Sequence, residues 1–432
     1  MSEISKKTPF GLIPSTWSFA PLRSIVCRIT EKNENRSENV LTISARDGLV
    51  NQRDYFNKSV ASKNLSKYVY LRKGDFAYNK SYSNGFPYGA IKRLEKYPVG
   101  IVSTLYICFR NSSESIDNEF LKYLFDSPLW HNEVRMIAKE GGRAHGLLNI
   151  GINEFFDIML PIPPRKEQQK IAEILSSVDE AIEKTEQIIA QTEKVSKGLM
   201  QQLFTKGIGY SEFKKSSFGM IPKGWEEVQM NEISGSIRNG FVGTASPYYS
   251  TDENSIPYLM SNNVRKNKLD LNKLVHVDKS FHDKNQKSIL SKGDLLTVQS
   301  GHIGTTCVVT DEFDGANCHA LIVTSLSSSN VIPEYISYFL NSFEGYRRLR
   351  GIFVGSTIKH INVKDFKKLY LPIPSSIDEQ IQIVKILKSM DFKTDNEKKK
   401  VESLLKLKEG LMQQLLTGKV RVPVDEDEVI EA

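Results

Sequence analysis

The residue types that most often do chemistry do not form a catalytic or metal-binding pattern in this chain. Ser300-Gly301-His302 places a hydroxyl group near an imidazole, but the Gly-x-Ser-x-Gly turn that exposes a nucleophilic serine is absent from the sequence. Cys307 and Cys318 lie close to two histidines in the sequence, yet they lack the paired-cysteine spacing of structural zinc sites. We therefore expect no metal, no cofactor and no catalytic residue.

Motor and methyl-transfer functions would also leave sequence signatures. The sequence contains no GxxxxGK[ST] phosphate loop and no Asn-Pro-Pro-Tyr tetrapeptide of the kind that grips a flipped base. The chain has only 4 cysteines, which favours a reducing cytoplasm over a disulfide framework, and no stretch long and apolar enough to predict a membrane span. A nuclease site of scattered carboxylates would escape such a search, so a self-sufficient DNA-modifying enzyme remains an alternative.

Polar, glycine-containing loops are the segments whose chemistry points to a ligand. Asn79 to Asn84 and Gln299 to His302 each follow a strand-like Gly-Asp segment, and residues 141–145 and 355–360 combine glycine with cations. Small flexible residues beside cations suit close approach to a phosphate backbone, and Arg, Lys, Asn and Gln are the usual readers of base edges. The pattern indicates DNA binding, although ordinary solvated hairpins and helix-capping loops have similar compositions.

The candidate DNA-binding residues come from these loops and from one further polar segment of the second half. They are Lys80, Ser81, Tyr82, Asn84, Arg143, His145, Asn262, Arg265, Gln299, Ser300, His302, Thr357 and Lys359. Arg347, Arg348 and Arg350 are more typical of a solvated helix face.

The charge balance is compatible with a polyanionic partner. The chain carries a net charge of +7, and its last eleven residues (422–432) contain five acids and no Lys or Arg, so residues 1–421 carry +12. A positive body of this size favours nucleic acid through counterion release, but charge alone would equally suit a basic soluble protein.

The elements that must position these loops come from a duplication. Five segments recur in the same order at offsets between 208 and 219. The pairs are 10–17 with 218–225, 71–75 with 290–294, 119–124 with 334–339, 160–163 with 371–374, and 198–203 with 410–415. The period is too long for a solenoid repeat, so each copy is a full domain. The two copies keep a common frame and differ in their loops.

Each copy is predicted to be a mixed α/β body followed by a long helix. Strand-like segments precede a helical pattern over Asn118–Ala138 in the first copy and Pro333–Arg350 in the second. The Leu-Pro-Ile-Pro segments at 160–163 and 371–374 are expected to stop regular structure, because proline disfavours helix and lacks a backbone donor.

After each body, apolar residues recur every three or four positions, which is typical of a coiled coil. We expect the two helices to pair antiparallel within the chain, although each could instead pack on its own body. The middle of the second helix, near Lys398, is polar and should pair less well. Exposed residues near the helix ends are docking candidates for partner proteins. They are Met200, Gln201, Leu203, Met412, Gln413 and Leu415.

The predicted fold class is α+β, with two tandem mixed α/β domains, each followed by a long helix, and the two helices forming an intramolecular antiparallel coiled coil. The expected segments are the first domain (1–164), the first helix (165–207), the second domain (208–375), the second helix (376–419) and an acidic tail (420–432).

The duplicated motifs resemble those of the specificity subunit of type I restriction-modification systems. The resemblance rests on Ile13-Pro14 to Trp17 and Leu160 to Pro163 with Glu167-Gln168, together with their second copies at 221–225, 371–374 and 379–380. It implies a non-catalytic, cytoplasmic subunit whose two domains each read half of a bipartite site in double-stranded DNA. It further implies helices that set the spacer, two methyltransferase subunits and restriction subunits as partners. The alternatives are a DNA-binding subunit of a related methyltransferase-nuclease system and a coiled-coil scaffold that binds proteins but not DNA.

Overall fold

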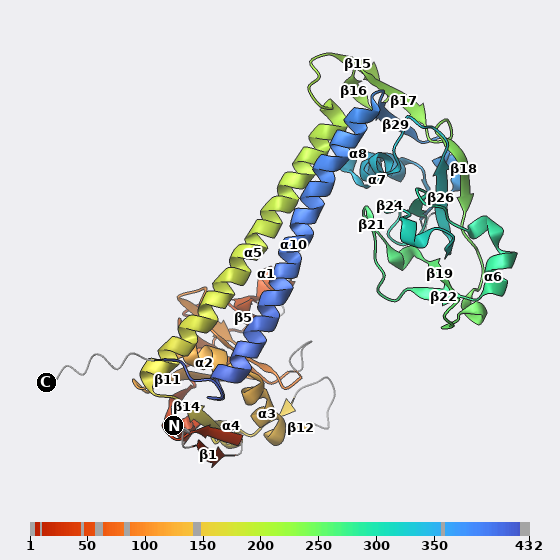
Figure 1. Ribbon diagram of the computed structural model, residues 1–432. Coiled ribbons are helices and arrows are strands. Elements are labelled where there is room, and N and C mark those ends of the chain that lie inside the picture. The colour runs from red at the N-terminus through yellow and green to blue at the C-terminus, as the bar shows by residue number, and fades with distance from the viewer. Residues whose placement is uncertain are drawn as a thin grey trace. The chain divides into compact units, whose positions relative to one another are not determined.

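The computed structural model describes residues 5–8, 11–44, 47–56, 64–81, 87–140, 148–355 and 359–423. The chain divides into two compact units, which we describe separately. Unit 1 comprises residues 1–185 and 400–432, and unit 2 comprises residues 186–399. Each unit contains a globular body, one part of the long helix α5 (Arg165–Lys206) and one part of the long helix α10 (Ile377–Leu415) (Figure 1).

The body of unit 1 is built on an antiparallel sheet with the strand order β4-β11-β8-β9. These strands are Val26–Ile29, Ile107–Asn111, Phe76–Asn79 and Ala90–Arg93, respectively. The other strands pair as β1–β2, β3–β14, β5–β6, β7–β10 and β12–β13. Their bounds are β1 Ser5–Thr8, β2 Gly11–Pro14, β3 Ser18–Pro21, β5 Leu41–Ser44, β6 Gly48–Asn51, β7 Val69–Arg72, β10 Val99–Val102, β12 Lys139–Glu140, β13 Leu148–Asn149 and β14 Met159–Ile162. The helices are α1 Gln52–Phe56, α2 Asn118–Phe125, α3 Pro128–Ile137 and α4 Ile152–Phe156.

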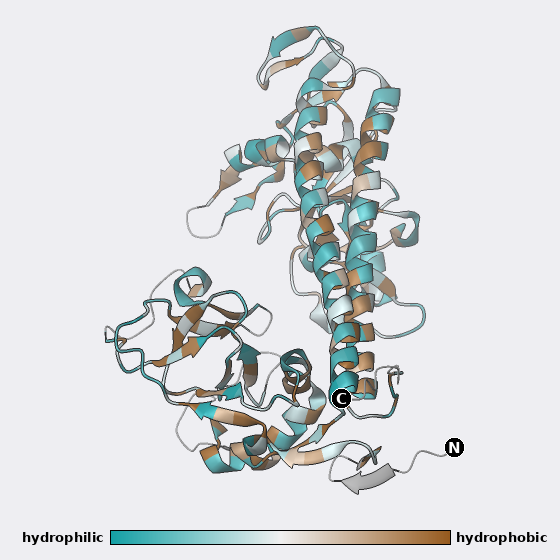
Figure 2. Ribbon diagram, turned by 90° about the vertical axis from the view of Figure 1, so that its left-hand side faces the viewer, coloured by the Kyte–Doolittle hydropathy of each residue, from teal (hydrophilic) through white to brown (hydrophobic). Residues whose placement is uncertain are grey.

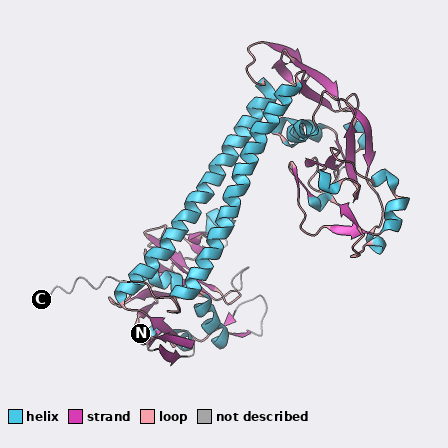
Figure 3. Cartoon of the chain, viewed as in Figure 1, coloured by secondary structure: helices cyan, strands magenta, loops and turns pink. Residues whose placement is uncertain are grey.

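The body of unit 2 repeats this topology, with the central strand order β18-β26-β23-β24. Both bodies consist of short strands and helices, in contrast to the two long helices (Figure 3). These strands are Ser234–Asn239, Leu321–Leu326, Leu295–Val298 and Thr306–Val308. The other strands are β15 Phe213–Ser216, β16 Gly219–Pro222, β17 Trp225–Gln229, β19 Ile256–Leu259, β20 Val264–Arg265, β21 Lys268–Leu269, β22 Val275–Val277, β25 Asn317–Cys318, β27 Phe353–Val354, β28 His360–Ile361 and β29 Tyr370–Pro374. The helices are α6 Lys279–Lys284, α7 Pro333–Asn341, α8 Phe343–Gly351 and α9 Val363–Phe366. Unit 2 differs by a three-stranded sheet, β22-β19-β25, and the hairpin β20–β21.

A pair of short helices follows the central sheet in each body, where the sequence predicts one longer helical segment. In unit 1 the break falls at Ser127, whose hydroxyl caps α3 by accepting a hydrogen bond from the Trp130 amide at 3.4 Å. In unit 2 Ser342 caps α8 through the Gly345 amide at 3.1 Å. Serine at this position satisfies an otherwise unpaired amide of the first turn. The shared cap keeps the second helix in the same register in both copies.

The Leu-Pro-Ile-Pro segments form strands, so the prediction that they stop regular structure is wrong. Strand β14 pairs antiparallel with β3, and β29 pairs antiparallel with β17. In the described part of the chain each of these sheets has two strands, so one edge of the proline-bearing strand needs no backbone donor. The exit from each body is thus a strand that leads into the long helix.

The long helices lie side by side and antiparallel within each unit, as the heptad pattern predicts (Figure 1). Figure 2 shows apolar and polar residues interspersed along both helices. In unit 1, Leu175 of α5 and Leu415 of α10 are buried in the same core cluster as the body. In unit 2, Leu203 and Leu387 share such a cluster. The polar middle is accommodated by an ion pair between Lys398 Nζ and Glu193 Oε1 at 2.8 Å.

Buried glutamates at the start of each long helix join the repeated motifs. Glu167, 1% exposed, accepts a hydrogen bond from Trp17 Nε1 at 3.0 Å and two from the Arg421 guanidinium at 2.7 and 3.0 Å. Glu379 accepts hydrogen bonds from Trp225 Nε1 at 3.2 Å and from the Tyr210 hydroxyl at 2.9 Å. In both units the donors come from the start of the body and from the segment after the other long helix.

Adjacent glutamines complete this junction. Gln168 Nε2 donates to the carbonyl of Pro163 at 2.9 Å, and its Oε1 accepts from the Asp117 amide at 2.8 Å. Gln380 makes the corresponding bonds to Pro374 at 3.0 Å and to Ile332 at 3.1 Å. The Glu-Gln pair that marks each helix start therefore fixes the helix to the exit strand and to the short helices of its body.

The predicted docking residues divide by exposure. Leu203, Met412 and Leu415 are buried in the cores of their own units, so they stabilise the fold and are not exposed docking residues. The heptad pattern selects them because it marks the face that packs inward. Gln201 and Gln413 are exposed, and Met200 is half-buried. The docking prediction is confined to these remaining side chains.

Candidate nucleic-acid interface

The described residues at the edges of the two predicted DNA-binding loops lie next to each other in both bodies. In unit 2 the Ile361 amide donates to the Gln299 carbonyl at 3.1 Å, and Ser300 forms an antiparallel bridge with His360. In unit 1 the Leu148 amide donates to the Lys80 carbonyl at 2.9 Å. The loop after the third strand of the central sheet order therefore lies against the strand that precedes the exit. In unit 2, predicted segments about sixty residues apart in the sequence therefore lie on one face.

Several predicted residues lie outside the part of the chain that the structure describes. These are Tyr82, Asn84, Arg143, His145 and Thr357. Lys80 and Ser81 are half-buried at the end of the described segment 64–81, and Lys359 is exposed at the start of 359–423.

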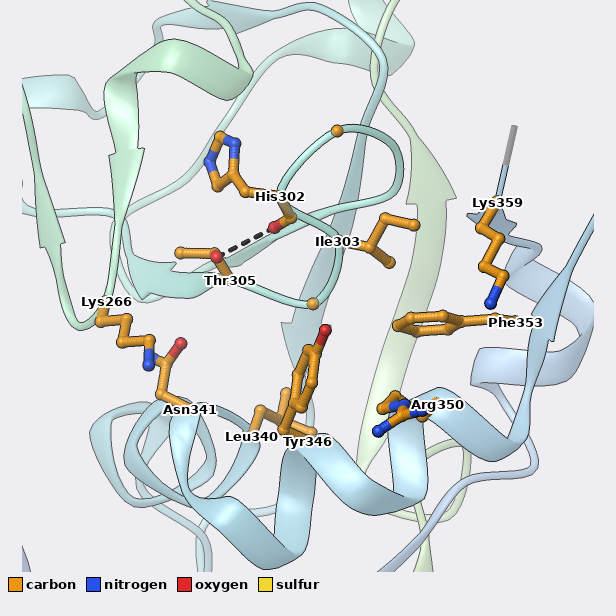
Figure 4. A pocket seen from close by; sticks show the side chains of 12 residues that line it. Lys266, His302, Ile303, Thr305, Leu340, Asn341, Tyr346, Arg350, Phe353 and Lys359 are labelled. Atoms are coloured by element: carbon orange, nitrogen blue, oxygen red, sulfur yellow. Dashed lines mark hydrogen bonds between the residues drawn. The ribbon is translucent and has the colours of Figure 1, made fainter. Parts of the chain in front are cut away.

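The hairpin β20–β21 brings a third segment to the predicted loops of unit 2. His302 Nε2 lies 3.2 Å from the carbonyl oxygen of Val264, which places the loop beside this hairpin. Arg265 forms an ion pair with Asp270 at 3.0 Å, and Asn262 is half-buried. The hairpin turn carries the exposed Lys266, whose side chain extends toward Asn341 of helix α7 (Figure 4).

A cavity of about 770 Å³ opens where these segments meet the helices α7 and α8 (Figure 4). Its lining residues are Lys266, Gly301, His302, Ile303, Gly304, Thr305, Leu340, Asn341, Tyr346, Arg350, Phe353 and Lys359. The lining includes several cationic side chains and no carboxylate. Such a lining attracts anions, because no negative charge in the wall offsets the positive ones.

Gly304 keeps the predicted loop close to helix α8. Its φ is +84°, which disfavours other residues, and an added Cβ would lie 2.9 Å from Leu349 Cδ1. Leu349 is fully buried, so it cannot move away from a larger side chain without disturbing the core. The loop therefore depends on glycine at this position to reach its place beside the helix.

The arginines of α8 divide into two kinds. Arg347 and Arg348 both form ion pairs with Glu344, at 2.6 and 3.1 Å. Burial alone would raise the pKa of Glu344, but the hydrogen bonds from these two arginines hold the pKa below its usual value. Among the described residues, no acidic side chain pairs with Arg350, which is exposed and lines the cavity. A solvated, paired helix face accounts for Arg347, whereas Arg348 is paired with Glu344 and packs over the Phe218 ring at 3.4 Å.

Sequence reasoning did not select Lys266, Tyr346 or Arg350, although a signal for Arg350 was present. Arg135 in the first body and Arg350 in the second each lie eight residues after the serine that caps their helix. Both arginines are exposed. An alignment of the corresponding helices of the two copies would have identified Arg135 and Arg350 as equivalent. Lys266 lies in a hairpin of unit 2, and its position beside the cavity depends on the tertiary fold.

The buried cysteines are unsuited to nucleophilic or metal chemistry. Burial raises the pKa of both the Cys307 and the Cys318 thiols to about 12, so each thiol is protonated at neutral pH. Within the described ranges, no group of three or more His, Cys, Asp or Glu side chains is placed to hold a metal ion. In the same ranges, no helix has the length and apolarity needed to cross a membrane.

Comparison with known proteins shows the family. The family model described as type I restriction modification DNA specificity domain matches residues 14–194 and again residues 222–406. The chain belongs to this family of DNA specificity proteins. The type I restriction enzyme MjaVIII specificity subunit of Methanocaldococcus jannaschii is 27% identical over 329 residues, which is 75% of each chain. The MjaIX specificity subunit of the same organism is 24% identical and covers 82% of this chain and 84% of that one.

Solved structures share the fold. A chain of a type I R-M system, solved in work on complex assembly and conformational transition, has a TM-score of 0.59 at 18% identity and covers 94% of this chain and 99% of that one. The type I restriction-modification S subunit from M. genitalium has a TM-score of 0.53 at 16% identity, covering 92% and 96%. The predicted class, a specificity subunit with two tandem recognition domains and paired long helices, is confirmed.

Proposed function

We propose that this specificity subunit reads a bipartite site in double-stranded DNA, with one half-site assigned to each body. The observation that carries this proposal is a repeated frame with different reading loops. The central strand order and the Glu-Gln junction recur in both units. The loops on the candidate face differ, since Lys80-Ser81 of the first body corresponds to Gln299-Ser300 of the second. Among the described residues, the β20–β21 hairpin belongs to unit 2 alone.

The physical basis is a separation of affinity from sequence selectivity. Cations on the candidate face would neutralise phosphates and supply affinity for any sequence. Polar side chains at base edges would supply selectivity, and two unlike faces would select two unlike half-sites. The length of the paired helices would set the spacer, in the way that geometry sets half-site separation in dimeric DNA-binding proteins.

We assign methyl transfer and cleavage to partner subunits and propose that this chain is not itself an enzyme. The support is the sequence, which lacks the nucleotide-binding and base-gripping motifs that those reactions use. The exposed Gln201 and Gln413 lie at equivalent positions of the identical segments 198–203 and 410–415. Two equivalent surfaces of this kind favour two copies of one partner, which we propose to be the methyltransferase subunit, with restriction subunits joining that assembly.

Expression of this subunit with and without its methyltransferase, followed by genome-wide mapping of methyladenine, tests the proposal. We expect a split motif with an undefined spacer only when both proteins are present. Methylation by this chain alone would instead show a self-sufficient enzyme. A complete absence of methylated motif, together with no salt-sensitive DNA binding by the complex, would favour a protein-binding scaffold.

A further inference from the structure

Some of the polar groups that line the cavity of unit 2 already form hydrogen bonds within the protein, and others do not. Asn341 is fully occupied, because its Nδ2 donates to Asn267 Oδ1 and the Thr306 carbonyl at 2.7 Å and its Oδ1 accepts from the Thr306 amide at 3.1 Å. Thr305 Oγ1 donates to the His302 carbonyl at 2.9 Å. Both side chains hold the loop and the helix in place and have little capacity left for a ligand.

Four groups of the lining make no such internal bond within the described part of the chain. They are the amines of Lys266 and Lys359, the guanidinium of Arg350 and the hydroxyl of Tyr346. Three of these groups are basic side chains, and they project from three different elements, so their side chains surround the opening (Figure 4). A wall of cations without a carboxylate suits phosphate groups that enter along one strand of DNA.

Tyr346 differs from the cations in chemistry and in how firmly it is held. Its ring stands within the cavity and meets the Phe353 ring edge to face, with centroids 6.2 Å apart and an interplanar angle of 78° (Figure 4). Phe353 is half-buried and belongs to the β27–β28 hairpin, which fixes it against the helix. Tyr346 nevertheless remains 44% exposed. A supported aromatic ring with a free hydroxyl suits contact with a base edge, such as a thymine methyl group, rather than with a phosphate.

Resting on the proposed function, we propose that this cavity binds one strand of the second half-site, and that different residues of its wall bind the backbone phosphates and contact a base. Lys266, Arg350 and Lys359 bind backbone phosphates, and Tyr346 contacts a base and determines its identity. Tyr346 is therefore a specificity-determining residue, and Arg350 supplies affinity that does not depend on sequence.

The test uses the complete complex with its methyltransferase and the DNA motif found by methyladenine mapping. Binding is measured between 50 and 200 mM salt on the motif and on duplexes that carry single-base changes in each half-site. The variants are Arg350→Ala and Tyr346→Ala, with Tyr346→Phe to separate the hydroxyl from the ring. Arg347→Ala is the matched control. It removes one positive charge from the same helix, but the Arg347 guanidinium is already paired with Glu344.

Arg350→Ala should weaken binding to all duplexes and reduce the slope of log affinity against log salt by about 0.9, with the motif unchanged. Tyr346→Ala should leave the slope unchanged and lower discrimination at one position of the second half-site by about tenfold. Arg347→Ala should change neither property. Discrimination retained by Tyr346→Ala at every position of the second half-site, or an unchanged salt slope for Arg350→Ala, would overturn the inference while the bipartite motif stands. A wild-type complex without sequence preference would contradict the proposed function itself.

Discussion

Glu167 and Glu379 occupy the same position in the two copies, and each collects hydrogen bonds from separate segments of its unit. Both carboxylates are nearly buried, at 1% and 8% exposure, and both accept a bond from the indole of a buried tryptophan. The remaining donor groups differ, with Arg421 in unit 1 and Tyr210 and the Ile208 amide in unit 2. The junction therefore keeps the glutamate and the tryptophan in both copies, while the other donors differ.

Replacement of Glu379 by Gln should destabilise unit 2. The amide group would turn a donor toward the indole, the phenol or the Ile208 amide, so at least one of these three donors would lose the carboxylate oxygen that accepts from it. A loss of about 1–3 kcal/mol in the free energy of unfolding is expected. Urea unfolding followed by tryptophan fluorescence measures it. Glu226→Gln, the same change at an exposed site of strand β17, is the control. Equal stability of the two variants would contradict this account of the junction.

The residues of this junction were visible in the sequence, but their role was not. Trp17, Glu167 and Gln168 stand out because they recur in the second copy. Recurrence alone does not say which side chains touch, since Glu167 and Arg421 are 254 positions apart. The candidate DNA face shows the same limit, because Arg350 looks like its paired neighbours until the helix is placed beside the cavity.

The long helices were the most predictable elements. Apolar periodicity sustained over many turns identifies a helix and its buried face with little dependence on the rest of the fold. The short elements were harder to predict. The Leu-Pro-Ile-Pro segments form two-stranded edges rather than breaks, and the serine caps divide each predicted helix into two. The strands depend on a partner strand from a distant segment, and the helix breaks depend on a local serine cap. Neither feature is visible in the apolar periodicity of the sequence.

A matched lengthening of both long helices should widen the spacer of the DNA motif. One heptad inserted between Thr192 and Glu193 and another between Lys398 and Lys399 would preserve the apolar phase and the Glu193–Lys398 ion pair. Seven residues add about 10 Å of helix, which corresponds to about three base pairs. Methyladenine mapping should show both half-sites unchanged and a longer spacer. An unchanged spacer, or a changed half-site, would show that the helices do not set the separation.

The whole molecule is a duplication whose two copies keep the same structural frame and differ in the candidate DNA-reading surface. The sheet order, the capped helices and the glutamate junctions recur, whereas, among the described residues, the cavity-forming β20–β21 hairpin occurs in unit 2 alone. The duplication and the fold class could be predicted from the sequence, because both depend on repeated patterns. Base contacts could not, because they depend on side chains that the tertiary fold brings together from distant segments.

Exchange of residues 15–160 for the corresponding body of another specificity subunit, followed by methyladenine mapping with the methyltransferase present, tests the central claim most directly. The exchanged segment keeps a tryptophan at the position of Trp17 so that the bond to Glu167 is retained. One half of the methylated motif should change, and the other half and the spacer should stay as they are. A motif in which both halves change together would contradict the assignment of one half-site to each body.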